Sequence, residues 1–507
     1  MTSTTLPRQR YRRLRLAIVR PRADAAVVCL VLTAALGLAL RLFLATLPGF
    51  AGDLRIFHDW ALRIAGEGPW HFYDNVGTSD YAPGYLWVLW GFGGADRLLH
   101  FSDGQWNFLL KTPAIVADLA SALLLYRMLG ERGRTTQMAA TVAWLLFPPA
   151  ILVGAFWGQI DSILAFFLLL TVYFVAKGRP VAGIAALALG FLVKPQAIAV
   201  GPFVAFWIMR EHPPVRWRIP LVWFECVGVA VGIVALASAP FLGYEPWRLL
   251  SILRNASDVA SYRVNSFWAY NVWSIGGLEH SALRCDVNGP CAKGFAPAVD
   301  FLGVSTRYWS IAIFASAQAA VMLALRKARG AEYLALGMTL SVMAFFLFLT
   351  RMHERYVFAA FLPLLFACAI AQSRALWAAF AILAAVHFAN LYFVLGGNYL
   401  FDARERPAYP DWVRITPFYD WLNSTYAVPQ LGNVEVTQML SAVMLTMFAA
   451  LLTYAGARSR LSFAGTGSDT TPVGGYRRWC VRRLAGDRVE TDSLRNNLAE
   501  KSSDPAF

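Results

Sequence analysis

The feature that most constrains this chain is the recurrence of long apolar segments along its 507 residues. A helix of about 20 apolar residues crosses a bilayer, and it satisfies its own backbone hydrogen bonds there. A secreted soluble protein would instead have one N-terminal apolar segment followed by ordinary patterning. We therefore expect an all-α polytopic membrane protein with about 12 transmembrane helices, near residues 24–47, 108–129, 136–154, 160–177, 180–193, 195–209, 219–240, 306–325, 331–350, 356–372, 375–396 and 435–456.

The composition agrees with a membrane protein. Hydrophobic residues make up 58% of the chain and charged residues 15%, which is too apolar for a soluble domain of this length. The net charge of +14 would suit a nucleic-acid partner, but the lysines and arginines lie in short loops, at the two ends and beside apolar segments. We interpret the charge as a sign of membrane topology and expect no nucleic-acid partner.

Basic residues orient the expected helices. Arginines crowd residues 8–22, directly before the first apolar segment, so the positive-inside rule places a basic tail, residues 1–23, in the cytoplasm. The expected transmembrane domain then covers residues 24–456, with external loops at 48–107, 241–305 and 397–434, and a disordered cytoplasmic tail covers 457–507. Residues 85–99 are apolar but short and Gly-rich, which indicates an interfacial or re-entrant helix within the first external loop. This topology puts the basic turns in the cytoplasm: Arg127/Arg132/Arg134, Lys177/Arg179, Arg210/Arg216/Arg218, Arg326/Lys327/Arg329 and Arg374.

Polar residues that are unusual at helix ends gather at the external edge of this topology. Ionisable groups in such places are costly unless they are solvated or paired, so their gathering on one side indicates a functional site. Snorkelling at the interface would explain each basic residue singly, but it would not explain the acids. The residues concerned are Asp53, Asp59, Gln159, Asp161, Lys194, Arg254, Arg263, Arg351, His353, Glu354 and Arg355.

Short blocks of sequence carry a resemblance to a known superfamily. They are GDLRIFHDW at 52–60, WGQIDS at 157–162, VKPQ at 193–196, APF at 239–241, RVNSFW at 263–268 and MHERY at 352–356. In this order they resemble the GT-C glucosyltransferases of N-glycan assembly, which use dolichyl-phosphate glucose. They look still closer to bacterial GT-C enzymes related to the second mannosyltransferase of GPI-anchor assembly. The resemblance covers roughly residues 50–360 and departs from the family pattern at Tyr81-Ala82-Pro83, where two prolines are usual.

The resemblance implies a catalytic base in the first external loop. Asp53 matches the family acid that follows the glycine, and Asp59 is the alternative. Attack of an acceptor hydroxyl at an anomeric carbon needs a carboxylate to take the proton and cations to stabilise the leaving phosphate. His353 matches a family histidine implicated at the donor phosphate, unless His353 and Glu354 only satisfy each other at a helix end.

Further residues are expected at the donor or the sugar. Arg355 and Arg263 are candidates for binding the donor phosphate, and Lys194 would reach either the sugar phosphate or lipid headgroups. We expect Gln159 and Asp161 to orient the sugar or a basic neighbour, and Trp268 to contact substrate. Alternatively, Asp53 and Asp161 would converge on a divalent cation. The sequence has no acidic pair of the Asp-x-Asp kind to support such a site, so we predict no metal and no cofactor.

The resulting hypothesis is an inverting hexosyltransferase, with mannose favoured over glucose. Its partners would be membrane lipid, a polyprenyl-phosphate sugar donor and a lipid-linked or cell-envelope glycan acceptor. The expected location is a bacterial plasma membrane, with the active site facing outward. Neither a Gly-rich nucleotide-phosphate loop nor a sizeable cytoplasmic domain is present in the sequence, which argues against direct use of a sugar nucleotide.

The rival class is a transporter or flippase of lipid-linked oligosaccharide. A transporter should carry polar sites near the midplane, often in two related halves, whereas the unusual charges here are expected at the outer edge. A polymerase or ligase of envelope glycan would differ only in its acceptor. Cys285 and Cys291 are close enough in sequence for a small disulfide if their loop faces an oxidising compartment, and are ordinary thiols otherwise.

Overall fold

The computed structural model describes residues 25–75, 79, 81–215, 218–243, 245, 247–257, 266–275, 300–395, 430–431 and 434–464. Several expectations from the sequence fall outside these residues. They concern the basic N-terminal tail, Arg263, the pair Cys285 and Cys291, and the chain beyond residue 464.

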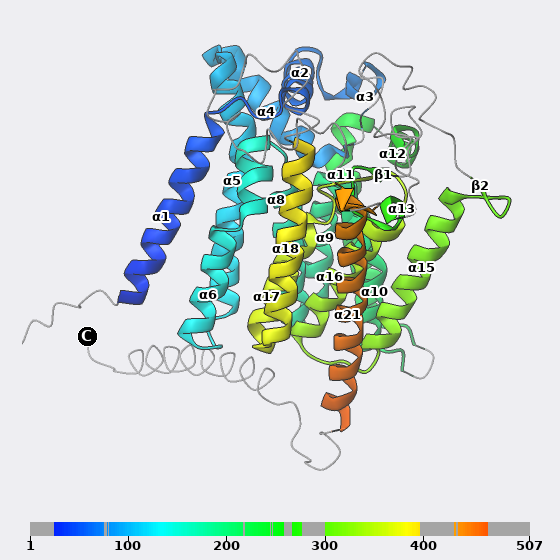
Figure 1. The fold of residues 1–507 in the computed structure, drawn as a ribbon. Helices are drawn as coiled ribbons and strands as arrows, with labels where there is room; N and C mark the ends of the chain where they lie inside the picture. The colour runs from blue at the N-terminus through cyan, green and yellow to red at the C-terminus, as the bar shows by residue number, and fades with distance from the viewer. Residues whose placement is uncertain are drawn as a thin grey trace, which may run out of the picture.

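The described chain is a bundle of helices, and the expected all-α polytopic fold is confirmed (Figure 1). Within the described residues, eight helical segments are long and apolar enough to cross a membrane. They are α1 (Ala25–Ala45), α5 (Asp103–Met128), the segment Arg134–Trp157, α11 (Leu221–Leu242), α15 (Thr306–Leu325), α16 (Ala331–Phe348), α18 (Arg374–Val394) and α21 (Val436–Ala464).

The other four expected spans coincide with shorter apolar helices. They are α8 (Asp161–Ala176), α9 (Pro180–Val193), η3 (Pro195–Val200) with α10 (Gly201–Glu211), and η6 (Phe358–Ala360) with α17 (Phe361–Ala371). The chain breaks between α9 and η3 because Lys194 adopts an extended conformation and Pro195 has no amide hydrogen to continue the helix. This break puts Lys194 at the tip between two short helices.

The segment Arg134–Trp157 is not one regular helix. It consists of α6 (Arg134–Leu145), α7 (Pro148–Ala150) and a π-helical turn, η2 (Ile151–Trp157). π-Helical turns are rare and are frequently found at functional sites. Here the turn ends at Gly158, whose φ of +95° is in the left-handed region.

A cap of short helices covers one end of the bundle (Figure 1). It contains α2 (Ala51–Glu67), η1 (Pro69–His71), α3 (Phe72–Asn75) and α4 (Pro83–Leu99). Helix α2 is amphipathic and buries Leu54, Phe57, Trp60, Ala61 and Ile64 against the aromatic start of α4. Helix α4 starts at a proline in its first turn and lies in this cap, as expected for the segment 85–99.

The same end of the bundle carries α12 (Arg248–Ser257), α13 (Val272–Ile275) and three short strand pairs (Figure 1). The strands are β1 (Ser266–Phe267) with β4 (Met352–His353), β2 (Asp300–Phe301) with β3 (Val304–Ser305), and β5 (Gln430–Leu431) with β6 (Val434–Glu435). The first pair is parallel and joins segments that are far apart in the sequence, with Phe267 opposite His353. The other two pairs are antiparallel.

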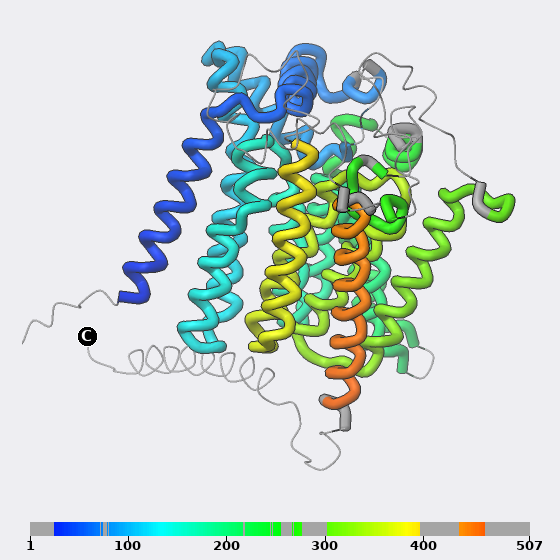
Figure 2. The backbone as a smooth tube through the Cα atoms, in the orientation of Figure 1, coloured from blue at the N-terminus to red at the C-terminus, as the bar shows by residue number. Residues whose placement is uncertain are grey.

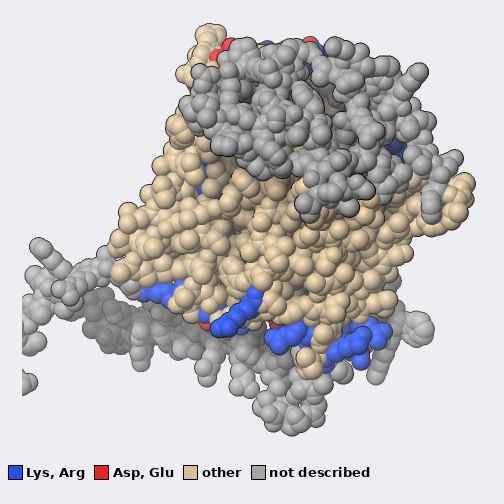
Figure 3. All heavy atoms as spheres, viewed as in Figure 1, with Lys and Arg blue, Asp and Glu red and all other residues tan. Residues whose placement is uncertain are grey.

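Lysine and arginine side chains gather along the opposite end of the bundle on the face shown in Figure 3. Exposed basic residues in the turns between helices include Arg132, Arg134, Lys327, Arg329 and Arg374. The bundle therefore has one basic end and one end covered by the cap. This polarity agrees with the positive-inside pattern of the sequence.

Two features differ from the sequence expectations. Arg41 of α1 and Asp118 of α5 form a buried ion pair, with Nε and Oδ2 3.0 Å apart, so the unusual charges are not confined to the outer edge. Helix α1 leans along the side of the bundle (Figure 2), and the ion pair ties it to α5. Helix α21 runs to Ala464, past the expected end at 456, and Ser459 donates a hydrogen bond to Ala324 O of α15.

Candidate active site

The site lies where α2 begins, under the cap. Asp53 is in the first turn of α2, where the free amide groups and the dipole of a helix favour a negative charge. Its Oδ2 accepts hydrogen bonds from Trp157 Nε1 at 2.9 Å and from Gln159 Nε2. Within the described residues no hydrogen bond reaches Oδ1, and the side chain is half-buried. One oxygen of this carboxylate is thus held in place while the other remains available to a ligand.

The two donors to Asp53 come from the end of the π-helical turn η2. Gly158 separates them, and a Cβ atom there would lie 2.6 Å from Leu54 Cδ2 of α2. Only glycine permits both this close approach and the left-handed backbone. The turn therefore directs Trp157 and Gln159, two residues apart, toward the same carboxylate oxygen.

Gln159 also links Asp53 to the basic side of the site. Its Oε1 lies 3.4 Å from Lys194 Nζ and 3.4 Å from Tyr81 Oη, both of which donate to it. Lys194 Nζ is 2.8 Å from Asp161 Oδ1, and both side chains are almost fully buried. Asp161 Oδ2 has no hydrogen-bond partner among the described residues. A single buried network thus runs from Asp53 through Gln159 to Lys194 and Asp161.

The segment after α16 brings a second charged group to the site. Arg355 Nη1 pairs with Glu354 Oε1 at 2.9 Å, and Glu354 Oε2 lies 3.7 Å from His353 Nδ1. Burial alone would raise the pKa of Glu354, but His353 and the charge of Arg355 hold that pKa below its ordinary value. Burial alone would lower the pKa of Arg355, but Glu354, Asp53 and Asp161 raise it, so the guanidinium stays charged. The same guanidinium lies 5.6 Å from the centre of the Trp157 ring.

Strand pairing positions this charged segment. β4 is held against β1, and Trp268, directly after β1, makes a further bridge to His353. Trp268 has a φ of +58°, which is uncommon for a residue with a side chain. Asn390 of α18 braces this turn, because its Nδ2 donates to Trp268 O at 2.7 Å.

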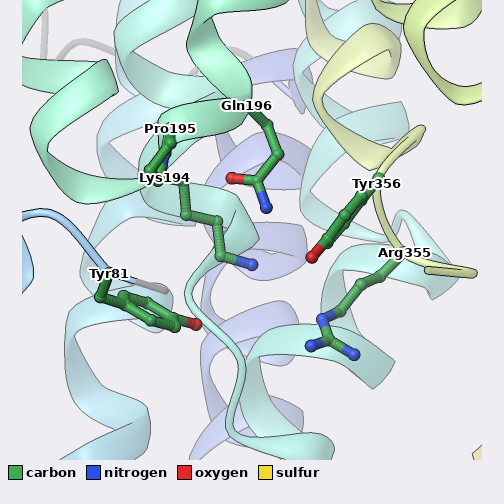
Figure 4. A pocket seen from close by; sticks show the side chains of 6 residues that line it. All are labelled: Tyr81, Lys194, Pro195, Gln196, Arg355 and Tyr356. Atoms are coloured by element: carbon green, nitrogen blue, oxygen red, sulfur yellow. The ribbon is translucent and has the colours of Figure 1, made fainter. Parts of the chain in front are cut away.

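A small pocket, called the cavity below, opens beside the network and is lined by Tyr81, Lys194, Pro195, Gln196, Arg355 and Tyr356. In Figure 4 the polar ends of Tyr81, Lys194, Arg355 and Tyr356 point into the same space, and Gln196 reaches it from η3. Two cationic groups and two phenolic hydroxyls therefore face one small volume. Such a lining suits an anionic group that also carries acceptor oxygens.

The structure brings most of the residues predicted from the sequence together. Asp53, Gln159, Asp161, Lys194, His353, Glu354, Arg355 and Trp268 all belong to this region. Asp59 does not join them, since it is exposed on another face of α2. Arg263 lies outside the described residues, three positions before β1. No group of three or more His, Cys, Asp or Glu in the described chain has an arrangement that could hold a metal ion.

Three residues of the site were not predicted from the sequence. Trp157 was part of a matched block without a role of its own, yet its indole holds Asp53. In the sequence, Tyr81 marked only a departure from the family pattern and Tyr356 was only part of a matched block, yet both line the cavity. The adjacency of Trp157 to Gly158 and Gln159 was the available signal, because the glycine lets both side chains face the same way.

The comparison with protein families agrees with this architecture. Residues 103–456, well over half of the chain, match the model of the ALG6, ALG8 glycosyltransferase family. The matched range contains Trp157, Gln159, Asp161, Lys194 and the segment 352–356, whereas Asp53 precedes it. No curated protein gives a match to the chain. This protein therefore belongs to the ALG6, ALG8 glycosyltransferase family and is a multi-pass membrane glycosyltransferase.

Proposed function

We propose that this protein transfers one hexose from a polyprenyl-phosphate sugar to a lipid-linked or cell-envelope glycan acceptor, with inversion at the anomeric carbon. Membership of the family implies a polyprenyl-linked donor and a glycan acceptor. The observation that carries the proposal is the arrangement at the site. A carboxylate with one unengaged oxygen, Asp53, shares a buried network with Lys194, which faces the cavity together with Arg355.

In this proposal Asp53 is the general base. The acceptor hydroxyl attacks C1 of the sugar, its proton passes to the Asp53 carboxylate, and the bond between C1 and the phosphate oxygen breaks. The electron pair of that bond leaves with the polyprenyl phosphate. The hydrogen bonds from Trp157 and Gln159 to Oδ2 fix the carboxylate, so that Oδ1 is the oxygen that takes the proton.

The leaving phosphate would occupy the cavity beside Lys194 and Arg355. Lys194 offers a compact ammonium, and Arg355 offers a planar fork of donors suited to phosphate oxygens. Tyr81 and Tyr356 add hydroxyl groups at the same space. These groups stabilise negative charge that develops on the phosphate as the sugar departs.

The charges at the site call for a further cation. Lys194 and Arg355 are outnumbered by the carboxylates of Asp53, Asp161 and Glu354. A donor phosphate adds another negative charge, which the site accommodates better if another basic group approaches. Arg263, three residues before β1, and His353 are the candidates that the sequence blocks supply.

Two observations bear on the identity of the hexose, and they favour different sugars. The sequence blocks resemble the bacterial relatives of the GPI-anchor mannosyltransferase, which favours mannose. The members that give the matching family its name are glucosyltransferases, which favours glucose. We keep mannose as the first donor to test, with glucose as its equal competitor in the same experiment.

We also propose that transfer takes place on the non-cytoplasmic side of a bacterial plasma membrane. The site lies at the capped end of the bundle, and the basic turns lie at the other end. Basic turns mark the cytoplasmic side of membrane proteins. A polyprenyl carrier presents its sugar at the membrane surface, which is where the cavity lies in this arrangement.

A transfer assay in membranes tests the proposal. Membranes that contain the wild-type chain, the Asp53→Asn variant or no added chain receive polyprenyl-phosphate mannose or polyprenyl-phosphate glucose, each labelled in the sugar. Endogenous lipid-linked and envelope glycans serve as acceptors. We expect wild-type membranes to transfer label from one of the two donors, and membranes with a well-expressed Asp53→Asn variant to match the membranes without added chain.

Other outcomes would change the proposal. Transfer from a labelled sugar nucleotide in the absence of any polyprenyl carrier would contradict the donor class. Transport of an intact labelled lipid-linked oligosaccharide across the bilayer, without sugar transfer, would favour the transporter. The buried pair Arg41 and Asp118 does not by itself favour a transporter, because Arg41 also donates to the backbone carbonyl groups of Gly37 and Leu145 and the pair ties α1 to α5.

A further inference from the structure

We infer that Lys111 is a positioning residue of the transfer site, because it fixes the junction between α1 and α2 that presents Asp53. The inference rests on the proposed role of Asp53 as the base. Lys111 belongs to α5 and touches neither the cavity nor Asp53. Its influence on the reaction therefore has to pass through the backbone that it holds.

Lys111 is an unusual buried lysine. Its side chain is fully buried, and its Nζ donates to Ala45 O at 3.3 Å and to Leu47 O. Both acceptors lie at the end of α1, where carbonyl groups lack helical partners and carry partial negative charge. Within the described chain none of its hydrogen bonds goes to a carboxylate. The amine thus acts as a cap for the end of α1.

The junction after this cap is tightly enclosed. Gly49 has a φ of +72°, and a Cβ atom there would lie 2.7 Å from Phe156 O and 3.0 Å from Lys111 Cε. The next residue, Phe50, donates its amide hydrogen to Trp157 O at 3.2 Å. Lys111 therefore holds one side of the junction, and the π-helical turn that also supplies the donors to Asp53 holds the other.

Asp53 stands only a few residues beyond this enclosure, in the first turn of α2. A general base has to lie within hydrogen-bond reach of the proton that it abstracts, so a small displacement of the helix start weakens catalysis. Replacing Lys111 with methionine keeps an unbranched side chain as far as Cε but removes the Nζ that forms the cap. We expect kcat to fall about 10- to 100-fold, as is typical when a catalytic group is misplaced by about 1 Å. The KM for the donor should change little, because the cavity lining is untouched.

The experiment compares Lys111→Met, Lys111→Arg and Gly49→Ala with the wild type in purified, full-length form. Lys177→Met is the matched control, since Lys177 lies at the far end of α8 and donates to Tyr173 Oη. The kinetic readout is kcat and KM for the donor identified in membranes. A second readout, independent of activity, is hydrogen exchange of the amides in residues 46–54.

The expected pattern is specific to the junction. Lys111→Met and Gly49→Ala should lower kcat at an unchanged donor KM and should speed amide exchange in residues 46–54. Lys111→Arg should recover part of the lost kcat and part of the lost amide protection, because it restores a buried cation near the carbonyl groups. Lys177→Met should resemble the wild type in both readouts.

Two results would overturn the inference. One is a Lys111→Met variant with wild-type kcat and wild-type exchange in residues 46–54. The other is a raised donor KM at unchanged kcat, which would make Lys111 part of the donor site. The inference and the proposed function fail separately: a wild type that transfers neither sugar contradicts the function, while the exchange data still decide whether Lys111 holds the junction.

Discussion

At the scale of single residues, the proposed chemistry depends on which oxygen of Asp53 already accepts hydrogen bonds. Trp157 and Gln159 both donate to Oδ2, and Gln159 alone also contacts Lys194. Gln159 is therefore better described as a positioning residue than as a ligand of the sugar. The sequence placed Gln159 among the candidates, and its contacts with Asp53 and Lys194 are the reason that we propose a positioning role.

Substitution of Gln159 tests this role. Gln159→Leu removes the amide that orients Asp53 and contacts Lys194, so we expect kcat to fall by about 10-fold or more with little change in donor KM. Gln318→Leu is the matched control, since Gln318 is also a buried glutamine but bonds to Ala199 O and Ser341 rather than to Asp53 or Lys194. Steady-state kinetics with the purified variants measure both effects. A rise in donor KM alone for Gln159→Leu would show instead that Gln159 binds the donor.

Glu354 gives a prediction about pH. Its pKa is lowered in the folded protein, so its ionised form stabilises the fold above the ordinary value of 4.5 and the stabilisation is lost as pH falls through the lower native pKa. Removing one partner of a buried pair costs about 3 kcal/mol. We expect Glu354→Gln to melt below the wild type at pH 7 and this gap to shrink below pH 4.5. Glu211→Gln, at an exposed position, should show no such gap at any pH.

At the scale of elements, two parts of the chain meet in a way that sequence patterns do not reveal. The segments 266–267 and 352–353 are too short to show strand periodicity, yet they pair in parallel and hold His353 next to Trp268. The sequence marked both segments only because each belongs to a block shared with a known superfamily. Asn390 of α18 supports this contact by donating to Trp268 O across 122 residues of sequence, and local sequence does not encode such a long-range contact.

Asn390 tests the importance of this pairing. Asn390→Ala leaves Trp268 O without its donor in a buried place, at a cost of about 1–3 kcal/mol. Because β1 supports β4, we expect a lower melting temperature together with a raised donor KM. Asn107→Ala on α5 is the control, since Asn107 makes no hydrogen bond with a side chain or loop in the described part of the chain. A lower melting temperature with unchanged KM would limit Asn390 to a structural role.

At the scale of the whole molecule, the sequence was sufficient to predict the class of fold and the helices. Long apolar segments and basic turns are properties of the chain itself, and the bundle reproduces both. The break at Lys194 also followed from a proline and two short apolar segments. The Arg41 and Asp118 pair was not anticipated, because each charge alone looks like an isolated exception within an apolar helix. The π-helical turn η2 was missed because an apolar run does not reveal which helical register it takes.

The orientation of the whole molecule can be tested by labelling. Asp59→Cys places a thiol on the exposed face of α2, and Arg326→Cys places one in a basic turn. In intact cells, and with the six native cysteines replaced by serine, we expect a membrane-impermeant maleimide to label Asp59→Cys and to label Arg326→Cys only after lysis. Labelling in the reverse order would place the site on the cytoplasmic side.

The central claim is that Asp53 takes the proton from the acceptor. The most direct test is the single-turnover rate of sugar transfer by purified wild type, Asp53→Asn and Asp59→Asn at saturating donor. We expect Asp53→Asn to lose about 10²- to 10⁴-fold in rate, as is typical for loss of a general base, and Asp59→Asn to stay near the wild type. A folded Asp53→Asn protein that transfers sugar at the wild-type rate would contradict the account.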